Sequence, residues 1–152
     1  MARPSPRMLI VCSAGGHLTE ALQAIEGVPM EFDVATFRLP HLQLPRGARA
    51  IHYLTDPHVS PWKYAVNAAQ SVRLMLKIRP SVVLTTGAGI AIACALIGKC
   101  MGAKLIFVET VAGVRDLSRT GSLLYRFADL FIVQWPELRG RYPRASYGGK
   151  VL

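Results

Sequence analysis

Three unbroken apolar runs, each followed by a turn or loop and then a helix-forming segment, constrain the fold of this chain most strongly. They occupy residues 8–12, 82–84 and 105–108, within strands expected at residues 8–12, 82–85 and 104–108. A run without alternating polar residues predicts a strand buried on both faces, as in parallel sheets. Glycine-rich turns at residues 13–16 and 86–89 follow the first two runs. This order of strand, turn, helix and strand predicts an α/β fold, a Rossmann-like doubly wound parallel sheet.

The rest of the chain continues this alternation within one expected domain, residues 1–152. Neither an internal repeat nor an interior linker divides it. Further strands are expected at residues 32–37, 51–54 and 130–133, helices at 17–26, 62–78, 90–101, 122–128 and 136–141, and an irregular tail at 146–152.

Composition excludes several classes of protein. Apolar residues make up 51% of the chain and charged residues 18%, which excludes intrinsic disorder. No apolar stretch reaches the roughly 20 residues of a membrane span, and the start lacks the pattern of a signal peptide, so an intracellular location is expected. The three cysteines, Cys12, Cys94 and Cys100, are odd in number and form no CxxC pair, so neither a disulfide framework nor a zinc site is expected. We expect all three to be buried.

The chain is basic, with 18 Lys and Arg against 9 Asp and Glu, a formal charge of +9. No run of five basic residues is present, so a nucleic-acid-binding tail is not expected. Dispersed positive charge on an apolar chain favours peripheral contact with an anionic membrane surface. The basic residues nominated for that contact are Lys63, Arg73, Lys77 and Arg79.

Two glycine-rich loops provide candidate anion sites. In an open parallel sheet, ligands bind beyond the carboxyl ends of the strands. Glycines there let backbone N–H groups approach a phosphate, and the start of the next helix favours negative charge. The candidate phosphate-binding residues are Ser13, Gly15, Gly16, Thr86, Gly87 and Gly89.

Two titratable side chains at the same strand ends are candidates for acid–base chemistry. His17 follows Gly16 at the expected helix start, where it could act as a base or donate to a phosphate. Glu109 directly follows the strand expected at residues 104–108, where a carboxylate could bind sugar hydroxyls or accept a proton. Which of the two is the base stays open. Glu20, in the first turn after His17, is expected to cap that helix.

Some other side chains are assigned to solvent or core. His41, His52 and His58 lie in expected loops or at sheet edges, so we expect them to be solvated. Trp62 and Tyr64 are at helical spacing with later apolar residues of the helix at 62–78 and are expected to join the core.

Several segments together resemble one family of sugar transferases. They are residues 12–20 (CSAGGHLTE), 85–89 (TTGAG), 107–110 (FVET), 128–138 (ADLFIVQWPEL) and 142–149 (YPRASYGG). The chain resembles the PssD-type subunits of bacterial exopolysaccharide glycosyltransferases. It is similar in the same way to the membrane-anchoring subunit of the eukaryotic split N-acetylglucosaminyltransferase, which acts on dolichol-linked sugar.

The resemblance implies the amino-terminal, acceptor-side half of a GT-B glycosyltransferase. A separate donor-binding subunit would hold the nucleotide sugar, a UDP-sugar, at the shared cleft, and the acceptor would be a polyprenyl-diphosphate-linked sugar. It implies no cofactor and no metal. The eukaryotic relatives carry an amino-terminal membrane helix that is not expected here, so we expect a peripheral position on the cytoplasmic face of the inner membrane. Family members commonly carry an arginine where this chain has Gly113. Arg115 is the nearby candidate to replace it and joins the candidate residues for binding the acceptor or its phosphates.

Two other functions stay open. The chain could be a non-catalytic membrane scaffold that recruits the donor-binding subunit. It could also be a dinucleotide-binding domain, because Gly87 and Gly89 follow a strand and Glu109 comes 22 residues after Gly87, near the offset of a ribose-binding carboxylate. Ile92 occupies the position of the third glycine in that motif, which counts against it.

Overall fold

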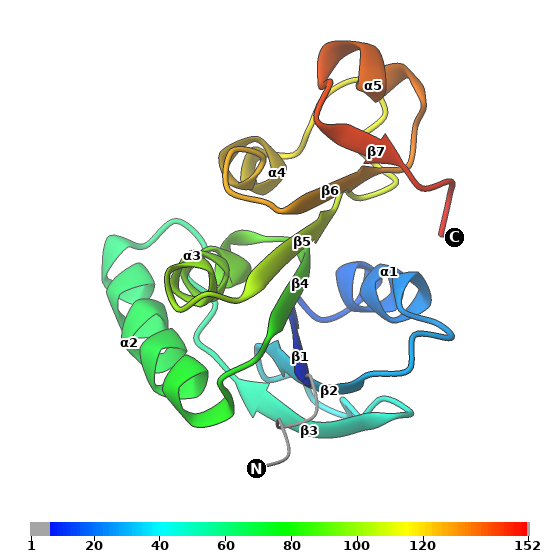
Figure 1. Ribbon diagram of the computed structural model, residues 1–152. Coiled ribbons are helices and arrows are strands. Elements are labelled where there is room, and N and C mark those ends of the chain that lie inside the picture. Colours follow the sequence, from blue (N-terminus) through cyan, green and yellow to red (C-terminus); the bar gives the residue numbers. More distant parts are fainter. Residues whose placement is uncertain (1–6, 152) are drawn as a thin grey trace.

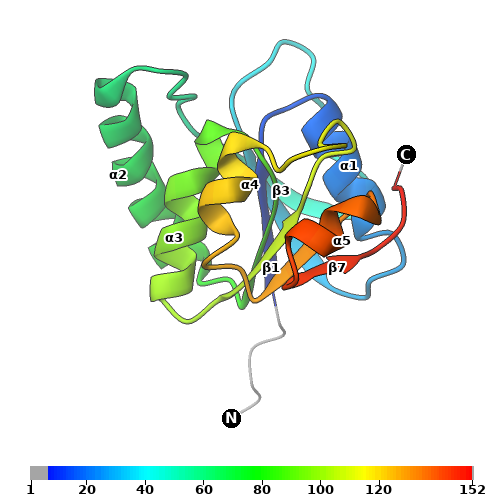
Figure 2. The same cartoon turned by 90° about the horizontal axis from the view of Figure 1, so that it is seen from above.

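The computed structural model describes residues 7–151, which form a seven-stranded parallel sheet flanked by helices (Figures 1 and 2). The strand order is β3-β2-β1-β4-β5-β6-β7. The strands are β1 (Arg7–Cys12), β2 (Glu31–Thr36), β3 (Ala48–Tyr53), β4 (Val82–Gly87), β5 (Lys104–Val108), β6 (Leu130–Val133) and β7 (Ala145–Tyr147). The helices are α1 (Gly16–Ala24), α2 (Pro61–Ile78), the 3-10 turn η1 (Gly89–Ala91), α3 (Ile92–Cys100), α4 (Arg119–Leu124) and α5 (Glu137–Arg141).

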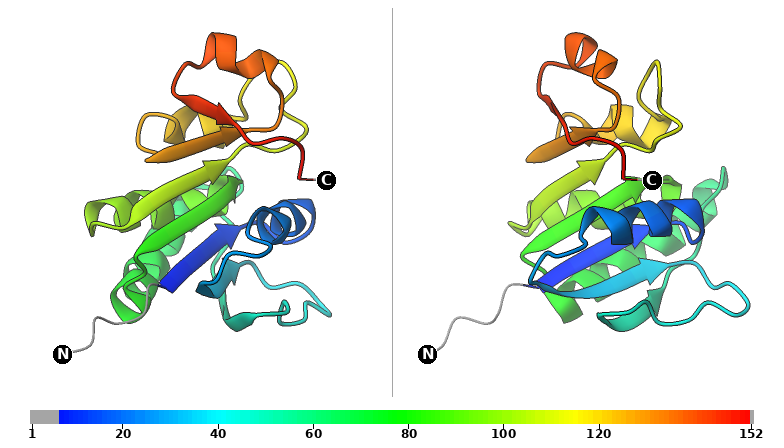
Figure 3. Two further views of the ribbon diagram at one scale, coloured as in Figure 1. Left: turned by 45° about the vertical axis from the view of Figure 1, so that its right-hand side comes forward. Right: turned by 90° about the vertical axis from the view of Figure 1, so that its right-hand side faces the viewer.

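Two hydrophobic cores, one on each face of the sheet, stabilise this arrangement. Side chains alternate along β1, so that Leu9 and Val11 enter one core and Ile10 enters the other. Helices α2, α3 and α4 cover the first face, and α1 lies on the other, as Figures 2 and 3 show. The predicted Rossmann-like doubly wound sheet is confirmed.

Three sequence-based boundaries were wrong. The expected tail contains the edge strand β7, whose three residues carry too little apolar pattern to predict a strand. Strand β3 begins at Ala48 instead of residue 51, because its partly exposed residues pair with β2 at one edge of the sheet. Helix α4 begins at Arg119 instead of residue 122, because the Ser118 side chain accepts a hydrogen bond from Gly121 N and caps it there.

Helix α2 carries an exposed outer surface. Leu74, Met75 and Ile78 face the core as expected, but Trp62 is 77% exposed and Tyr64 is also outside the core. The expectation that these two aromatic side chains pack inside was wrong, because the first turn of α2 extends past the ends of the strands (Figure 2). Across residues 7–151, no helix has both the length and the apolar character needed to cross a membrane.

The cysteines divide between core and surface. Cys12 and Cys94 are buried, and burial raises the pKa of their thiols to about 12 and about 11. Cys100 is exposed at the end of α3, so the expectation that all three are buried was wrong for this residue.

Candidate functional site

The carboxyl ends of β1, β4 and β5 meet at one edge of the sheet. Strand β1 pairs with β4, where Cys12 aligns with Gly87, and β4 pairs with β5, where Thr85 aligns with Phe107. The chain leaves β1 toward β2 on one side, while β4 continues toward β5 on the other. This divergence is the topological switch point at which open α/β sheets bind ligands. Figure 3 shows the three arrowheads ending at this edge, beside the start of α1.

The first glycine loop opens directly into α1. Gly15 has φ +98°, a conformation that L side chains rarely adopt, and it is exposed together with Gly16. Its carbonyl accepts the first helical hydrogen bond, from Thr19 N at 3.0 Å. No Cβ contact would be made within 4 Å at either glycine, so the space beside them is open. The start of α1 therefore offers unobstructed N–H groups to an anion.

His17 lies between the two glycine loops. Its carbonyl accepts a hydrogen bond from Thr86 Oγ1 at 2.8 Å, which ties α1 to the end of β4. Its ring lies beside Gly87, because a Cβ built on that glycine would be 3.7 Å from His17 Cε1. The ring is partly buried, and its Nδ1 is buried with no hydrogen-bond partner. The ring therefore has unused hydrogen-bonding capacity at the edge of the sheet where ligands commonly bind.

The second glycine loop is less open than the first. Gly87 has φ +115°, and its N–H donates to Thr85 Oγ1 at 2.9 Å. A Cβ on Gly89 would lie 3.0 Å from the Tyr64 hydroxyl, so this glycine permits close packing against α2. Of the predicted phosphate-binding residues, the structure brings Thr86 and Gly87 to the His17 side and places Gly89 against α2.

Glu109 is wholly internal. Its side chain accepts hydrogen bonds from Thr110 N at 3.0 Å, Ser118 N at 3.0 Å and Ser118 Oγ at 3.2 Å. The residue is 0% exposed, and Gly121 packs directly against its carboxylate. Burial raises the pKa of this carboxyl, while the Ser118 and Thr110 bonds oppose that rise. The carboxylate thus faces the inside of the following loop instead of the solvent.

Glu20 links α1 to the loop after β5 through hydrogen bonds that the sequence did not indicate. It is 3% exposed, and its Oε1 accepts hydrogen bonds from Thr110 Oγ1 and Val111 N, both at 3.2 Å. The expectation that it caps α1 was wrong, because it reaches across to the loop after β5. The one available signal was its position three residues after His17, which puts both side chains on one side of the helix.

The loop at residues 110–118 is also held from its other side. Trp135 Nε1 donates to Val111 O at 2.7 Å, and Gln134 Nε2 donates to Glu109 O at 3.0 Å. These two bonds give a structural reason for the Gln-Trp pair in the sequence. Arg141 donates to the Arg115 carbonyl at 2.9 Å, while the Arg115 side chain is exposed.

Asp116 ties the same loop to α5. It accepts from the Tyr142 hydroxyl at 2.7 Å, which lowers the pKa of the Asp116 carboxyl, and it pairs with Arg141 at 3.0 Å. The loop is thereby fixed while Arg115 remains free to face solvent or a ligand.

Together these residues form a candidate anion-binding edge that contains one imidazole. Ser13 is partly exposed in the loop that leads to Gly15, Gly16 and His17, with Thr86 and Gly87 beside them. No group of three or more metal-ligating side chains occurs within the described part of the chain. A ribose-binding role for Glu109 would require breaking its bonds to Ser118, so the geometry disfavours the dinucleotide alternative.

Comparisons with known proteins agree on a family and a fold. The family model described as "Oligosaccharide biosynthesis protein Alg14 like" matches residues 31–151. A relative from Yarrowia lipolytica, named UDP-N-acetylglucosamine transferase subunit ALG14, is 37% identical over an alignment that covers 97% of this chain and 82% of the relative. The Mus musculus protein of the same name is 29% identical, with 99% of this chain and 85% of the relative covered. The first glycine loop precedes the segment matched by the family model but lies within the murine alignment.

Solved structures with a similar fold are longer enzymes. MurG of Acinetobacter baumannii superimposes with a TM-score of 0.67 at 16% identity, over 98% of this chain. UDP-N-acetylglucosamine 2-epimerase of Rickettsia bellii superimposes with a TM-score of 0.75 at 11% identity, over 97% of this chain. This chain spans 45% of the length of each. At these identities the likeness concerns the fold.

Proposed function

Because the chain belongs to the family of Alg14-like oligosaccharide biosynthesis proteins, we propose that it is the acceptor-side subunit of a two-component glycosyltransferase. The observation that carries this proposal is the position of His17, at the open start of α1 and beside Gly87. The curated relatives are named as transferase subunits, which supports a partner that binds the donor. The reaction we propose transfers a sugar from a UDP-sugar to a polyprenyl-diphosphate-linked acceptor, as in the PssD-type systems.

The acceptor would bind at the first glycine loop. Its diphosphate oxygens would accept hydrogen bonds from the backbone N–H groups at the start of α1, where the positive end of the helix dipole also favours an anion. Ser13, Gly15 and Gly16 surround that position. The second loop contributes through Thr86, which holds the His17 backbone, and Gly87, which leaves room for the His17 ring.

His17 would act as the base in the transfer step. The acceptor hydroxyl oxygen forms a bond to the anomeric carbon of the donor sugar, while the bond from that carbon to the nucleoside diphosphate breaks. The imidazole takes the hydroxyl proton, and the nucleoside diphosphate leaves with the bonding electrons. An imidazole suits this task because histidine is the side chain that most often serves as a general base in enzymes.

Glu109 would position this machinery without touching the substrate. Its carboxylate fixes Thr110 and Ser118, and these residues bound the loop that carries Arg115. Arg115, with its exposed side chain, would then contact the acceptor or donor phosphates at the cleft.

The outer surface of α2 would rest on the membrane at the cytoplasmic face of the inner membrane. Trp62, Val72 and Leu76 are exposed along one side of the helix, and Lys63 and Arg73 flank them. Apolar side chains bordered by cations suit a bilayer with anionic headgroups. Binding to anionic liposomes should fall with added salt and with Trp62→Ser, and equal binding to neutral liposomes would contradict this contact.

Reconstitution tests the proposed function. The purified chain alone should not turn over a UDP-sugar, and the chain coexpressed with a donor-binding subunit should transfer sugar to a polyprenyl-diphosphate acceptor. Turnover by the chain alone would contradict a two-component enzyme. Full turnover in a complex whose glycine loop is altered (Gly16→Val) would instead favour the scaffold alternative, because a scaffold needs no anion site.

A further inference from the structure

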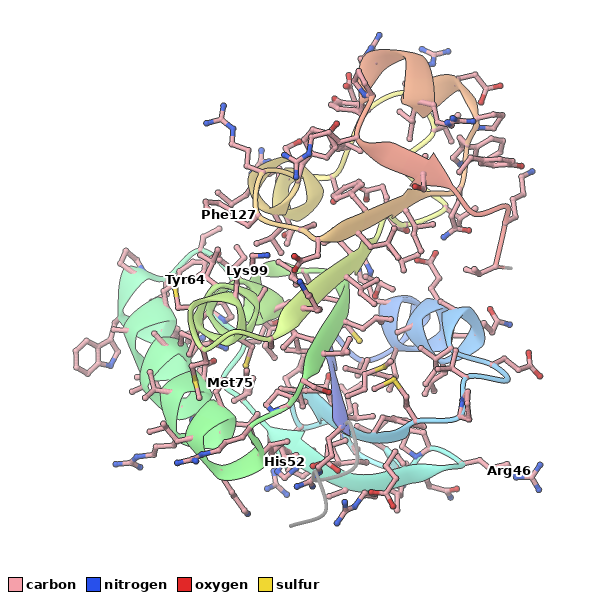
Figure 4. All side chains as sticks on the ribbon, viewed as in Figure 1. Arg46, His52, Tyr64, Met75, Lys99 and Phe127 are labelled. Atoms are coloured by element: carbon pink, nitrogen blue, oxygen red, sulfur yellow. The ribbon has the colours of Figure 1, made fainter. Side chains whose placement is uncertain are left out.

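A second polar cavity lies far from the glycine loops, under the C-terminal end of α2. Its volume is about 230 Å³. Arg7 is the first residue of β1, at the opposite end of that strand from the glycine loop. Figure 4 shows His52 beside the end of α2, in a region where nitrogen-bearing side chains gather. The polar residues that line the cavity are Arg7, Asp33, Arg49, His52 and Lys77.

Asp33 is the buried carboxylate in the lining of this cavity. Its side chain is 4% exposed, and its Oδ2 lies 3.3 Å from Arg7 Nη2 and 3.2 Å from His52 Nε2. Its Oδ1 is buried and has no hydrogen-bond partner among the described residues. The expectation that His52 is solvated was therefore wrong, because β3 directs it toward Asp33 under α2. A buried carboxylate oxygen without a donor indicates a missing partner with a proton to give.

Positive charge exceeds negative charge around Asp33. Arg7, Arg49 and Lys77 line the cavity against one carboxylate. Arg49 also pairs at 2.8 Å with Glu31, which is exposed at the surface. Lys77 forms no ion pair within residues 7–151, so its ammonium group is available to a ligand.

A groove borders the cavity. This groove has a volume of about 460 Å³ and runs between β3 and α2. It shares His52 and Lys77 with the cavity and adds Arg73. A ligand with a phosphate in the cavity therefore has space for the group attached to that phosphate.

We propose that this cavity binds a phosphomonoester group. Such a group offers several oxygens to Arg7, Arg49 and Lys77. Its singly protonated form also carries one P–OH, which can donate to the unpartnered Oδ1 of Asp33. Sulfate has similar size and charge but carries no proton near neutral pH, so the site distinguishes the two anions. The ligand is a lipid headgroup or a soluble phosphate ester, which share this chemistry.

Titration with inorganic phosphate and with sulfate, followed through backbone amide NMR shifts, tests the site. Phosphate should shift the amides of Ala50 and His52 and bind roughly tenfold more tightly than sulfate, because one hydrogen bond to a charged group is at stake. Lys77→Gln should weaken phosphate binding by about tenfold. Arg139→Gln, which removes the same charge from exposed α5 at the other edge of the sheet, should have no effect.

Asp33→Asn separates recognition from a structural role. This variant keeps the side-chain shape and removes the negative charge, so sulfate should gain affinity relative to phosphate. Equal affinity for both anions in the wild type, or phosphate shifts confined to Gly15 and Gly16, would overturn the proposal. The second result would leave the transferase site intact, so the two proposals fail separately.

Vesicle flotation identifies the source of the phosphate. Vesicles with phosphatidic acid, a monoester, are compared with vesicles of phosphatidylglycerol, a diester, at equal surface charge. Stronger binding to phosphatidic acid that disappears in Lys77→Gln assigns the site to a lipid headgroup. Equal flotation combined with phosphate shifts at Ala50 assigns it to a soluble phosphate ester.

Discussion

Replacing Ser118 by alanine tests whether the buried Glu109 carboxylate stabilises the fold through its hydrogen bonds to Ser118. Ser118 Oγ donates to the Glu109 carboxylate at 3.2 Å and accepts from Gly121 N at 3.0 Å, as the cap of α4. Losing the cap costs about 1 kcal/mol, and losing a hydrogen bond to a charged group costs about 1.5–3 kcal/mol. We therefore expect Ser118→Ala to lower the free energy of unfolding by about 2–4 kcal/mol near pH 7.

The loss should depend on pH with a definite sign. Burial raises the pKa of Glu109 in the folded state, so between its unfolded and folded values the folded protein binds more protons and stability falls as pH rises. Ser118→Ala removes a hydrogen bond that opposes this rise in pKa. The pH range over which stability falls therefore extends to higher pH in the variant. Below the ordinary glutamate pKa of about 4.3 the carboxyl is neutral in both states, and mainly the cap is lost.

Urea unfolding at pH 4 and pH 7.5 measures both quantities. Ser122→Ala is the matched control, because that serine is exposed in the same helix and its side chain makes no hydrogen bond in the described structure. A loss for Ser118→Ala that is equal at both pH values would refute the role assigned to the Glu109 charge. A loss no larger than that of the control would show that neither hydrogen bond of the Ser118 side chain stabilises the protein.

Two further predictions concern the core. Gly98→Ala places a Cβ 2.7 Å from Val83 Cγ2 and should lower the free energy of unfolding in urea by about 1–3 kcal/mol. The control Gly140→Ala has open space around it and should not lower that free energy. Equal effects of the two substitutions would show that α3 does not pack as described. In the native protein, a thiol reagent should label Cys100 rapidly and leave Cys12 unmodified until the protein unfolds, since burial raises the Cys12 pKa to about 12. Rapid labelling of Cys12 would mean that the core around β1 opens readily.

The central strands were predictable because a strand that is buried on both faces of the sheet has consecutive apolar residues. Residues 105–108 are apolar throughout, and the strand expected at residues 104–108 matches β5 as observed. Strand β7 was not predictable, because an edge strand of three residues depends on pairing with β6 instead of on its own composition.

The strand ends could be predicted as a site, but the directions of their side chains could not. The sequence placed Glu109 correctly after β5, yet its inward orientation depends on Ser118 and Gly121, which approach only in the folded chain. Glu20 accepts a hydrogen bond from Thr110, which is 90 residues away in the sequence. His52 is within hydrogen-bonding distance of Asp33 on the neighbouring strand. Such contacts leave no periodic signal in the sequence.

The rate of sugar transfer by a His17→Asn complex tests the central claim most directly. His41→Asn is the control, since His41 is exposed in a loop with φ +64° that asparagine tolerates. In the reconstituted enzyme, His17→Asn should lower kcat by about 10²–10⁴-fold and leave the KM for the UDP-sugar unchanged, while His41→Asn keeps normal turnover. Near-normal kcat for His17→Asn would contradict the account. If Glu109→Gln abolished activity while His17→Asn kept it, the base would be Glu109.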